Sequence, residues 1–165
     1  MKIEKRELSH KEAKYFYKLI KLTPNITGHT VKQLVNYKNT YVALDNGAAI
    51  GFCVWEKISK NWCEILILYV DEKHRKMGIS NSIIKYATAD IDRTGLNIFT
   101  ASRNPIVLNM LRKNNFKIAK LKELPLELKI FLVKYSLNGY RISEYFRKNA
   151  FTKEKPFPYG VYYKK

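Results

Sequence analysis

The sequence predicts one α/β domain, in which helices cover both faces of a mixed β-sheet. The chain has 165 residues, of which 46% are hydrophobic, and this suits a globular domain with a sizeable core. Strand-like runs in the first half follow one another as an antiparallel meander, whereas those in the second half alternate with helix-like segments. No apolar run approaches the roughly 20 residues that cross a bilayer, so we expect no membrane span.

The N-terminal segment predicts a strand and two helices. Residues 1–8, MKIEKREL, have the alternating character of a strand. Ser9 and Glu12 have the spacing of a capping box, in which both side chains bind backbone N–H groups at a helix start, and this predicts a helix over residues 10–21. TPNITG interrupts the pattern, and HTVKQLVNYK, residues 29–38, predicts a second, short helix.

Three strands are expected next. TYVALD, residues 40–45, and AAIGFCVWEKI, residues 48–58, are separated by Asn46-Gly47, the strongest short signal for a β-hairpin. WCEILILYV, residues 62–70, follows as a third strand. Cys53 and Cys63 lie inside these apolar runs, which favours reduced thiols in the core. Together with a charged N-terminus that lacks an apolar signal core, this predicts a cytoplasmic protein.

The second half predicts alternating elements: a helix over residues 80–92, a strand over 96–102, a helix over 104–115 and a strand over 116–121. LKIFLVKYS, residues 128–136, is rich in β-branched and aromatic residues, so we predict a further strand there, giving six to seven in all. We assign residues 1–136 to the domain and residues 137–165 to a basic, aromatic extension that packs on it. The extension contains a helix-like piece, RISEYFRKN, and an aromatic end, FPYGVYY.

The loop VDEKHRKMGIS, residues 70–80, joins a buried strand to a helix and carries several cations. Backbone N–H groups at a helix start lack partners and point outward with the positive end of the helix dipole, which makes an anion site. Gly78 lets a ligand approach the backbone, while Lys73, Arg75 and Lys76 add positive potential. We therefore expect this loop to hold a phosphate or pyrophosphate, although it contains no Walker motif.

Two motifs resemble the GCN5-related N-acetyltransferases, the GNAT superfamily. That family binds the pyrophosphate of coenzyme A with Gln/Arg-x-x-Gly-x-Gly/Ala, which corresponds here to Arg75, Gly78 and Ser80. A second family motif, Asn-x-x-Ala-x-x-x-Tyr-x-x-x-Gly-Phe, corresponds in spacing to residues 104–116, NPIVLNMLRKNNF. Its matched positions are Asn104, Val107, Leu111, Asn115 and Phe116, of which the first and the last are identical to the motif. The resemblance covers about residues 40–136 and implies the GNAT acyl-CoA N-acyltransferase fold.

The resemblance implies an enzyme that moves an acetyl group from acetyl-CoA to an amine. In the family, a bulge splays the fourth strand from the fifth and pantetheine lies in the gap. Backbone groups of residues 68–70, including Leu68 and Val70, would then face pantetheine, and Asn104 would reach it from the other side. The pyrophosphate would lie against the following residues: Arg75, Lys76, Met77, Gly78, Ile79 and Ser80. No spacing of His, Cys, Asp and Glu suggests a metal.

Glu64 is the candidate general base. It is the only charged residue of WCEILILYV and lies 11 residues before Arg75, a spacing that resembles the catalytic glutamate of the histone-modifying branch. Strand alternation predicts that Glu64, Leu66, Leu68 and Val70 share one face. The alternative is a strand-edge carboxylate that pairs with a lysine.

The general acid is open, because Leu111 replaces the usual tyrosine and cannot donate a proton. Tyr69, at the end of the strand, is one candidate, and the tail tyrosines Tyr159 and Tyr162 are others. A thiolate is also a tolerable leaving group near neutral pH, so the reaction can proceed without an acid.

The formal charge of +17 predicts attraction to polyanions, such as a nucleic acid or ribonucleoprotein. Residues 137–165 carry seven Lys and Arg against two Glu, interleaved with aromatics, which suits a nucleic-acid contact, a lid over the site or a dimer interface. Three functions compete: acetylation of a protein or small amine, acetylation of a nucleic-acid-associated acceptor, and a GNAT-fold binding module without turnover. A monomer and a homodimer are both compatible with the sequence.

Overall fold

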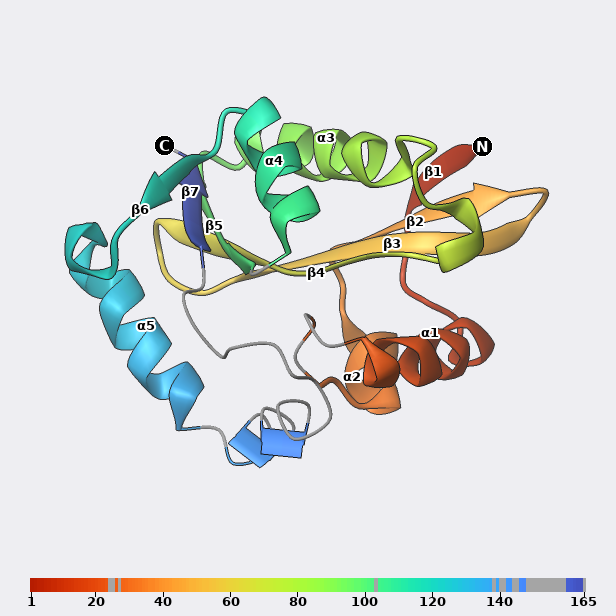
Figure 1. Cartoon of the computed structure of the whole chain (residues 1–165), viewed down its shortest axis with the longest axis horizontal. Helices are drawn as coiled ribbons and strands as arrows, with labels where there is room; N and C mark the ends of the chain where they lie inside the picture. Colours follow the sequence, from red (N-terminus) through yellow and green to blue (C-terminus); the bar gives the residue numbers. More distant parts are fainter. Residues whose placement is uncertain are drawn as a thin grey trace.

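The computed structural model of the chain describes residues 1–23, 26, 28–102, 104–137, 139, 142–143, 146–147 and 160–164. In this part of the chain, seven strands form one sheet in the order β1-β2-β3-β4-β5-β7-β6. β4 and β5 pair in parallel and the other neighbours are antiparallel. Helices lie on both faces of the sheet (Figure 1), so the α/β prediction is confirmed. No described helix is long and apolar enough to cross a membrane.

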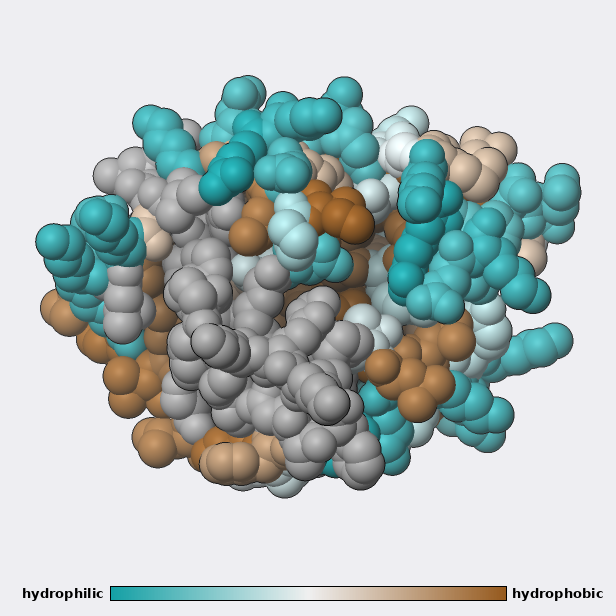
Figure 2. Space-filling view, viewed as in Figure 1, coloured by the Kyte–Doolittle hydropathy of each residue, from teal (hydrophilic) through white to brown (hydrophobic). Residues whose placement is uncertain are grey.

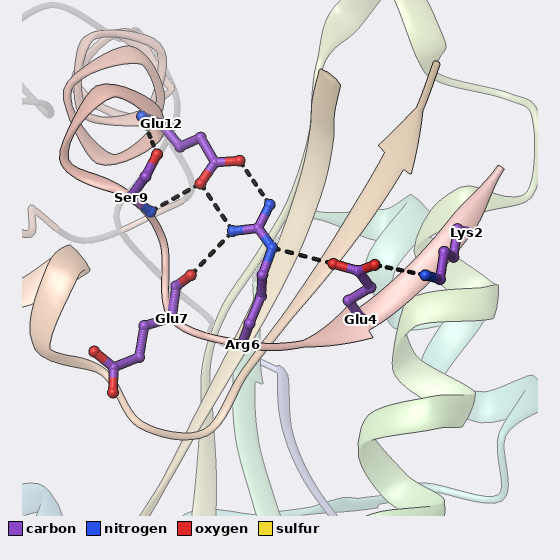
Figure 3. A network of polar contacts seen from close by, with 6 residues as sticks. All are labelled: Lys2, Glu4, Arg6, Glu7, Ser9 and Glu12. Carbon is purple, nitrogen blue, oxygen red and sulfur yellow. Dashed lines mark hydrogen bonds and ion pairs between the residues drawn. The ribbon is translucent and has the colours of Figure 1, made fainter. Parts of the chain in front are cut away.

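The N-terminal part matches the sequence pattern closely. β1 (Lys2–Lys5) leads into α1 (His10–Leu22), where Ser9 and Glu12 form the expected capping box. Arg6 binds both oxygens of Glu12, from Nη2 at 2.7 Å and from Nη1 at 2.9 Å, and thereby ties β1 to the helix start (Figure 3). These bonds lower the pKa of Glu12 to about 2, so the carboxylate stays ionised down to acid pH.

The meander follows as predicted. α2 (Val31–Asn36) precedes β2 (Thr40–Asp45), and the turn at Asn46 and Gly47 leads into β3 (Ala48–Lys57). Both turn residues have positive φ, 48° and 79°, which a two-residue hairpin of this type requires. β4 (Trp62–Val70) then occupies the centre of the sheet, where most of its side chains are buried.

The second half alternates helix and strand. A 3₁₀ turn, η1 (Glu72–His74), precedes α3 (Ile79–Asp92), β5 (Asn97–Ser102), α4 (Pro105–Lys113) and β6 (Lys117–Ala119). A second 3₁₀ turn, η2 (Leu121–Glu123), leads into α5 (Leu126–Ser136). β7 (Gly160–Lys164) comes from the C-terminal extension and enters the sheet between β5 and β6, with Thr100 opposite Tyr162.

Three apolar clusters hold these layers together. On one face, α3 and α4 cover a core that includes Ile83, Ile98 and Leu111. On the other face, α1 and α2 cover Phe52, Ile67 and their neighbours. Farther along that face, α5 packs on Trp62 and Phe99. The sheet is thus buried on both sides, as parallel and mixed sheets of this kind usually are.

The prediction of a strand over residues 128–136 is wrong, because this segment forms most of α5. Leu128, Phe131 and Leu132 have helical spacing and pack against the sheet. The outward positions of the helix are apolar too, so neither face shows a polar contrast that would reveal the helical period. Composition then favoured a strand although the packing selects a helix. The helix-like piece over residues 141–149 falls largely outside the described residues.

Candidate active site

A β-bulge interrupts β4 and opens the middle of the sheet. Val54 of β3 lies opposite Ile67, but the next residue, Trp55, lies opposite Ile65, so Leu66 is an extra residue on β4. Pairing of β4 with β5 runs from Trp62 to Glu64 and goes no farther, while β5 continues beside β7. The hydroxyl of Thr100 donates to the carbonyl of Ile65 at 3.0 Å, where the two strands part. Beyond this point no strand among the described residues pairs with the β5-facing edge of β4, and we call this edge open.

The bulge also changes which side chains share a face. Cys63 and Ile65 belong to the core under α3 and α4, and so do Leu68 and Val70. Leu66, Ile67 and Tyr69 belong to the core on the opposite face. Glu64 lies between Cys63 and Ile65 and therefore points to that opposite face. The prediction that Glu64, Leu66, Leu68 and Val70 share one face is wrong: the extra residue reverses the alternation after Leu66.

The open edge presents the backbone of Leu68 and Val70. Asp71 donates its backbone N–H to the carbonyl of Ile50 at 2.9 Å, which sets the phase of the β3–β4 ladder. Alternate residues of an antiparallel strand direct their polar groups to opposite sides, so Tyr69 faces β3 while Leu68 and Val70 face the gap. The backbone of these two residues therefore lies along the open edge of β4, and its contact with pantetheine stays a prediction.

The loop after β4 ends at a helix terminus that has no side-chain cap. Gly78 is the N-cap of α3 with φ 77°, and Lys76 also has positive φ, at 66°. The first intrahelical bond is from the N–H of Ser82 to the carbonyl of Gly78. The preceding N–H groups at the start of α3, those of Ile79, Ser80 and Asn81, therefore lack intrahelical partners. A 14-residue helix dipole points its positive end at this spot.

The side chains of the loop have different roles. Arg75 donates from Nε to the carbonyl of Val70 at 3.2 Å and from Nη1 to Glu72 at 2.8 Å, so it braces the loop against the end of β4. Ile79 is buried in the core, and only its backbone faces outward. Met77 is exposed, and Ser80 is half-buried at the helix start. These residues, which we call the cradle, present mostly backbone groups at the start of α3.

Glu64 and Tyr69 share a face but lie apart on it. Glu64 is only 6% exposed, with Glu56 opposite on β3 and Phe99 opposite on β5. Tyr69 is five residues farther along β4, about 15 Å away at strand spacing. Its ring packs on Phe16 at 6.0 Å between centroids and lies 5.9 Å from the Arg75 guanidinium. Burial raises the pKa of Tyr69, so its hydroxyl keeps its proton at neutral pH.

The second motif falls on α4. Asn104 is its N-cap, and its side-chain oxygen accepts from the N–H of Ile106 at 2.9 Å, which leaves the amide N–H₂ as the donor for a ligand. Leu111, at the position of the family tyrosine, is 1% exposed and packs in the core. Of the tail tyrosines, Tyr159 lies outside the described residues, and Tyr162 is placed by its backbone in β7. The described residues contain no group of three potential metal ligands.

Two residues of the site were not found from the sequence. The Thr100 hydroxyl links β5 to β4 where the two strands separate. Threonine is common in strands, so its presence gave no signal in the sequence. Gly51 lies opposite Val70, and a Cβ there would come within 2.8 Å of the carbonyl oxygen of Tyr69. A glycine inside the otherwise bulky run AAIGFCVW was the available signal, because such a glycine often marks a close backbone approach.

The comparisons with known proteins agree with this geometry. The family model described as "Acetyltransferase (GNAT) domain" matches residues 36–118, half of the chain. No curated protein matches the sequence. Among solved structures, Rv2747 from Mycobacterium tuberculosis, in complex with CoA and NLQ, covers 99% of this chain and 98% of its own at 12% identity, with a TM-score of 0.72.

Two further structures show the range of the fold. N-acetylglutamate synthase from Neisseria gonorrhoeae, complexed with coenzyme A and N-acetyl-glutamate, covers 98% of this chain at 14% identity and a TM-score of 0.72, although the match spans only 34% of that protein. Ard1 from Thermoplasma volcanium covers 72% of this chain and 84% of its own at 22% identity, with a TM-score of 0.61. At these identities the likeness concerns the fold.

Proposed function

This chain belongs to the GNAT acetyltransferase family, and we propose that it transfers an acetyl group from acetyl-CoA to an amine. The observation that carries the proposal is the combination of an open β4 edge with an uncapped α3 terminus directly after it. The first offers a row of backbone groups to an extended amide-containing arm, and the second offers a positive cradle to a diphosphate. Coenzyme A has both parts in this order. The CoA complexes of two proteins of the same fold support the assignment.

In this proposal the pyrophosphate lies on the N–H groups of residues 78–80, beside Arg75 and Lys76. Pantetheine runs back along the backbone of Val70 and Leu68, and the Asn104 amide approaches from α4. The acyl end then reaches the bulge at Leu66, close to where β5 leaves β4. Lys76 and Met77 are exposed beside the cradle, so they are placed to contact the nucleotide part.

The reaction needs an unprotonated amine. We assign Glu64 to accept the proton, directly or through a water, because it is the carboxylate on β4 next to the bulge. The amine nitrogen attacks the thioester carbonyl, the carbon–sulfur bond breaks, and CoA leaves as the thiolate. Backbone N–H groups at the bulge are candidates to stabilise the carbonyl oxygen as charge develops.

The thiolate regains a proton from a donor or from water. Tyr69 keeps its phenolic proton, but its ring lies beside Arg75, at the diphosphate end of the proposed cofactor path rather than at the acyl end. This geometry favours departure as the thiolate over a Tyr69 acid. Tyr69 stays a candidate whose test is the pH profile of the Tyr69→Phe variant: loss of the alkaline limb would identify it as the acid.

We propose that the acceptor carries negative charge or belongs to a nucleic-acid-associated molecule in the cytoplasm, since the chain has a formal charge of +17. The likeness over 98% of the chain to a synthase crystallised with N-acetyl-glutamate makes a small acidic amine one class to try. The likeness to a ribosomal-protein-S18-alanine N-acetyltransferase from Escherichia coli makes a protein N-terminus another. A release assay for the CoA thiol with glutamate, N-terminal peptides and tRNA-bound amines separates these classes.

The cofactor site is tested by calorimetry with acetyl-CoA on Gly78→Asp and its matched control Gly95→Asp. Both glycines have φ above 70° and open space at the Cβ position, but Gly95 lies after the far end of α3. The two variants therefore share the backbone strain, and only Gly78→Asp adds a negative charge to the cradle. We expect Gly78→Asp to lose about a hundredfold in affinity for acetyl-CoA, because the added carboxylate repels the diphosphate and the side chain keeps it from the backbone. Gly95→Asp should change the affinity little. Equal affinities would refute the site.

The base is tested by Glu64→Gln, with Glu56→Gln as the control across the strand pair. We expect kcat to fall about a hundredfold or more for the first and by little for the second, with acetyl-CoA affinity intact in both. Arg75→Glu should instead weaken cofactor binding, because the loop loses its brace to Val70 as well as a cation.

A second candidate function is a GNAT-fold module that binds acetyl-CoA without turnover. The buried Leu111, in place of the family tyrosine, favours it. Cofactor binding with no thiol release from any acceptor, and no difference between wild type and Glu64→Gln, would support this function over catalysis.

A further inference from the structure

The outer face of α5 carries an apolar stripe that the described part of the chain leaves exposed. Its members are Leu126 at 71%, Ile130 at 48% and Val133 at 62% exposure, and Leu137, directly after the helix, continues it at 74%. Figure 2 shows hydrophobic side chains gathered in the region where Figure 1 places α5, in contrast to the mostly hydrophilic upper rim of the molecule. Contiguous apolar surface of this kind usually marks an interaction site.

The protein's own core does not require the stripe. Leu128, Phe131 and Leu132 lie on the opposite side of α5 and already pack on Trp62 and Phe99. A helix with apolar residues on two opposite faces ordinarily packs against a partner on each of them. α5 therefore has one face that is satisfied within the chain and one that lacks a partner among the described residues.

We propose that two copies of this chain pair through α5, antiparallel, about a two-fold axis between Ile130 and Val133. The stripe has intervals of four, three and four residues, which is the seam spacing of paired helices. The series reads the same in both directions. In an antiparallel pair, Leu126 therefore contacts Leu137 of the second copy, and Ile130 contacts Val133. The two-fold axis repeats both contacts, so each residue of the stripe has an apolar partner.

The charges beside the seam complement this arrangement. Glu127 and Lys134 lie on the same side of the stripe, because each directly follows one of its members, Leu126 and Val133. In the antiparallel pair, each Glu127 comes beside Lys134 of the second copy. Glu127 is already oriented, because its oxygens accept from the Ser59 hydroxyl at 2.6 Å and from the Asn61 amide at 3.1 Å. A carboxylate accepts about four hydrogen bonds, so it has capacity left for a lysine.

An anionic membrane is the other surface that an apolar helix in a basic protein suits. The same Glu127 disfavours it, since an ionised carboxylate at the edge of the stripe would face lipid phosphates. The stripe's intervals are also the same in both directions along the helix, and binding to a lipid surface does not need this property. A single helix pair covers less than the standard ~800 Å² per partner, so we expect a reversible dimer whose population rises with concentration.

Sedimentation velocity of the full chain, over roughly 1 to 200 µM, tests the proposal across the range where small interfaces dissociate. We expect a shift from monomer to dimer in the wild type. Val133→Glu should weaken the dimer at least tenfold, whereas Leu22→Glu, on the exposed end of α1, should not. A wild type that stays monomeric throughout, or an equal effect of the two variants, would overturn the proposal.

A charge exchange tests the antiparallel register. Glu127→Lys and Lys134→Glu should each weaken the dimer several-fold, about the strength of two exposed ion pairs, and the double exchange should restore it. Both Glu127→Lys and the double variant lose the bonds to Ser59 and Asn61, so restoration isolates the contact between copies. Failure of the double variant to recover would exclude this register. Flotation of the wild type with phosphatidylserine vesicles, abolished by Val133→Glu, would replace the dimer with a membrane. None of these outcomes depends on the catalytic proposal.

Discussion

The two halves of β4 are both largely buried, but they have different neighbours in the sheet. Cys63 and Glu64 pair with β3 on one side and β5 on the other, so their backbone is used by the sheet. From Ile67 to Val70 the strand pairs with β3, and no other strand among the described residues pairs with it there. The backbone of the first half is therefore taken up by the sheet. In the second half, the backbone groups of Leu68 and the N–H of Val70 face the gap, while the Val70 carbonyl accepts from Arg75. Rigid, unused backbone groups are what an extended ligand can bind without reorganising the protein.

Amide hydrogen exchange should show the largest difference between these halves. We expect the N–H groups of Leu68 and Val70 to exchange about a thousandfold faster than those of Cys63 and Ile65, because only the latter face a neighbouring strand. Saturating acetyl-CoA should slow the first pair and leave the second unchanged. NMR-detected exchange at single residues provides the measurement. Equal protection of the four amides without ligand would mean that β4 is not divided as described.

Sequence reasoning found the elements around this division but not the division itself. The capping box at Ser9, the Asn46-Gly47 turn and the loop before Gly78 are local, and each has a chemical signature that needs no tertiary context. The bulge at Leu66 has none, since WCEILILYV would suit a regular buried strand equally well. It follows from the register against β3, which long-range pairing decides.

The other misses have the same origin. α5 resembles a strand in sequence because both of its faces are apolar. Which apolar residues face the sheet and which face outward is decided only by the packing of the helix. β7 pairs with β5 and β6, which lie more than 40 positions earlier in the sequence. Local sequence patterns do not predict pairing over such a separation. The motif positions of the loop and Asn104 lie at two helix starts beside the gap, and their binding of a ligand stays a prediction. The face shared by Glu64 was predicted wrongly in part, through the unseen bulge.

Gly51→Ala should give the next largest effect. The added methyl would lie 2.8 Å from the Tyr69 carbonyl oxygen and 3.1 Å from a methyl of Val70, so β3 must move away from the open half of β4. We expect the free energy of unfolding to fall by about 2–3 kcal/mol. Gly47→Ala, in the hairpin turn with open space around it, should cost only its left-handed backbone, about 1 kcal/mol. Urea denaturation measures both, and a ranking in the opposite order would contradict the close approach.

The smallest expected effect is the alkylation of Cys63 in the folded wild type, which should be very slow. Cys63 lies in the closed half of β4, donates to the carbonyl of Asn97 at 3.5 Å, and has its pKa raised to about 12 by burial. Between pH 8 and 10 the folded protein should therefore show almost no alkylation by iodoacetamide, whereas the urea-unfolded chain should react faster as its thiols ionise near pH 9. The same raised pKa makes the free energy of unfolding depend on pH. Above pH 9 only the unfolded thiol releases its proton, so Cys63 makes folding less favourable as pH rises toward 12.

The contrast with the open half comes from a cysteine placed in the loop that follows it. Met77 is 69% exposed, so Met77→Cys should be alkylated at the rate of an ordinary thiol and be protected by acetyl-CoA. Intact-mass analysis after timed alkylation separates the introduced thiol from the two buried ones. Rapid labelling of Cys63 at pH 8 in the folded wild type would show that the closed half opens as readily as the loop, and the distinction between a structural and a ligand-binding half of β4 would then be lost.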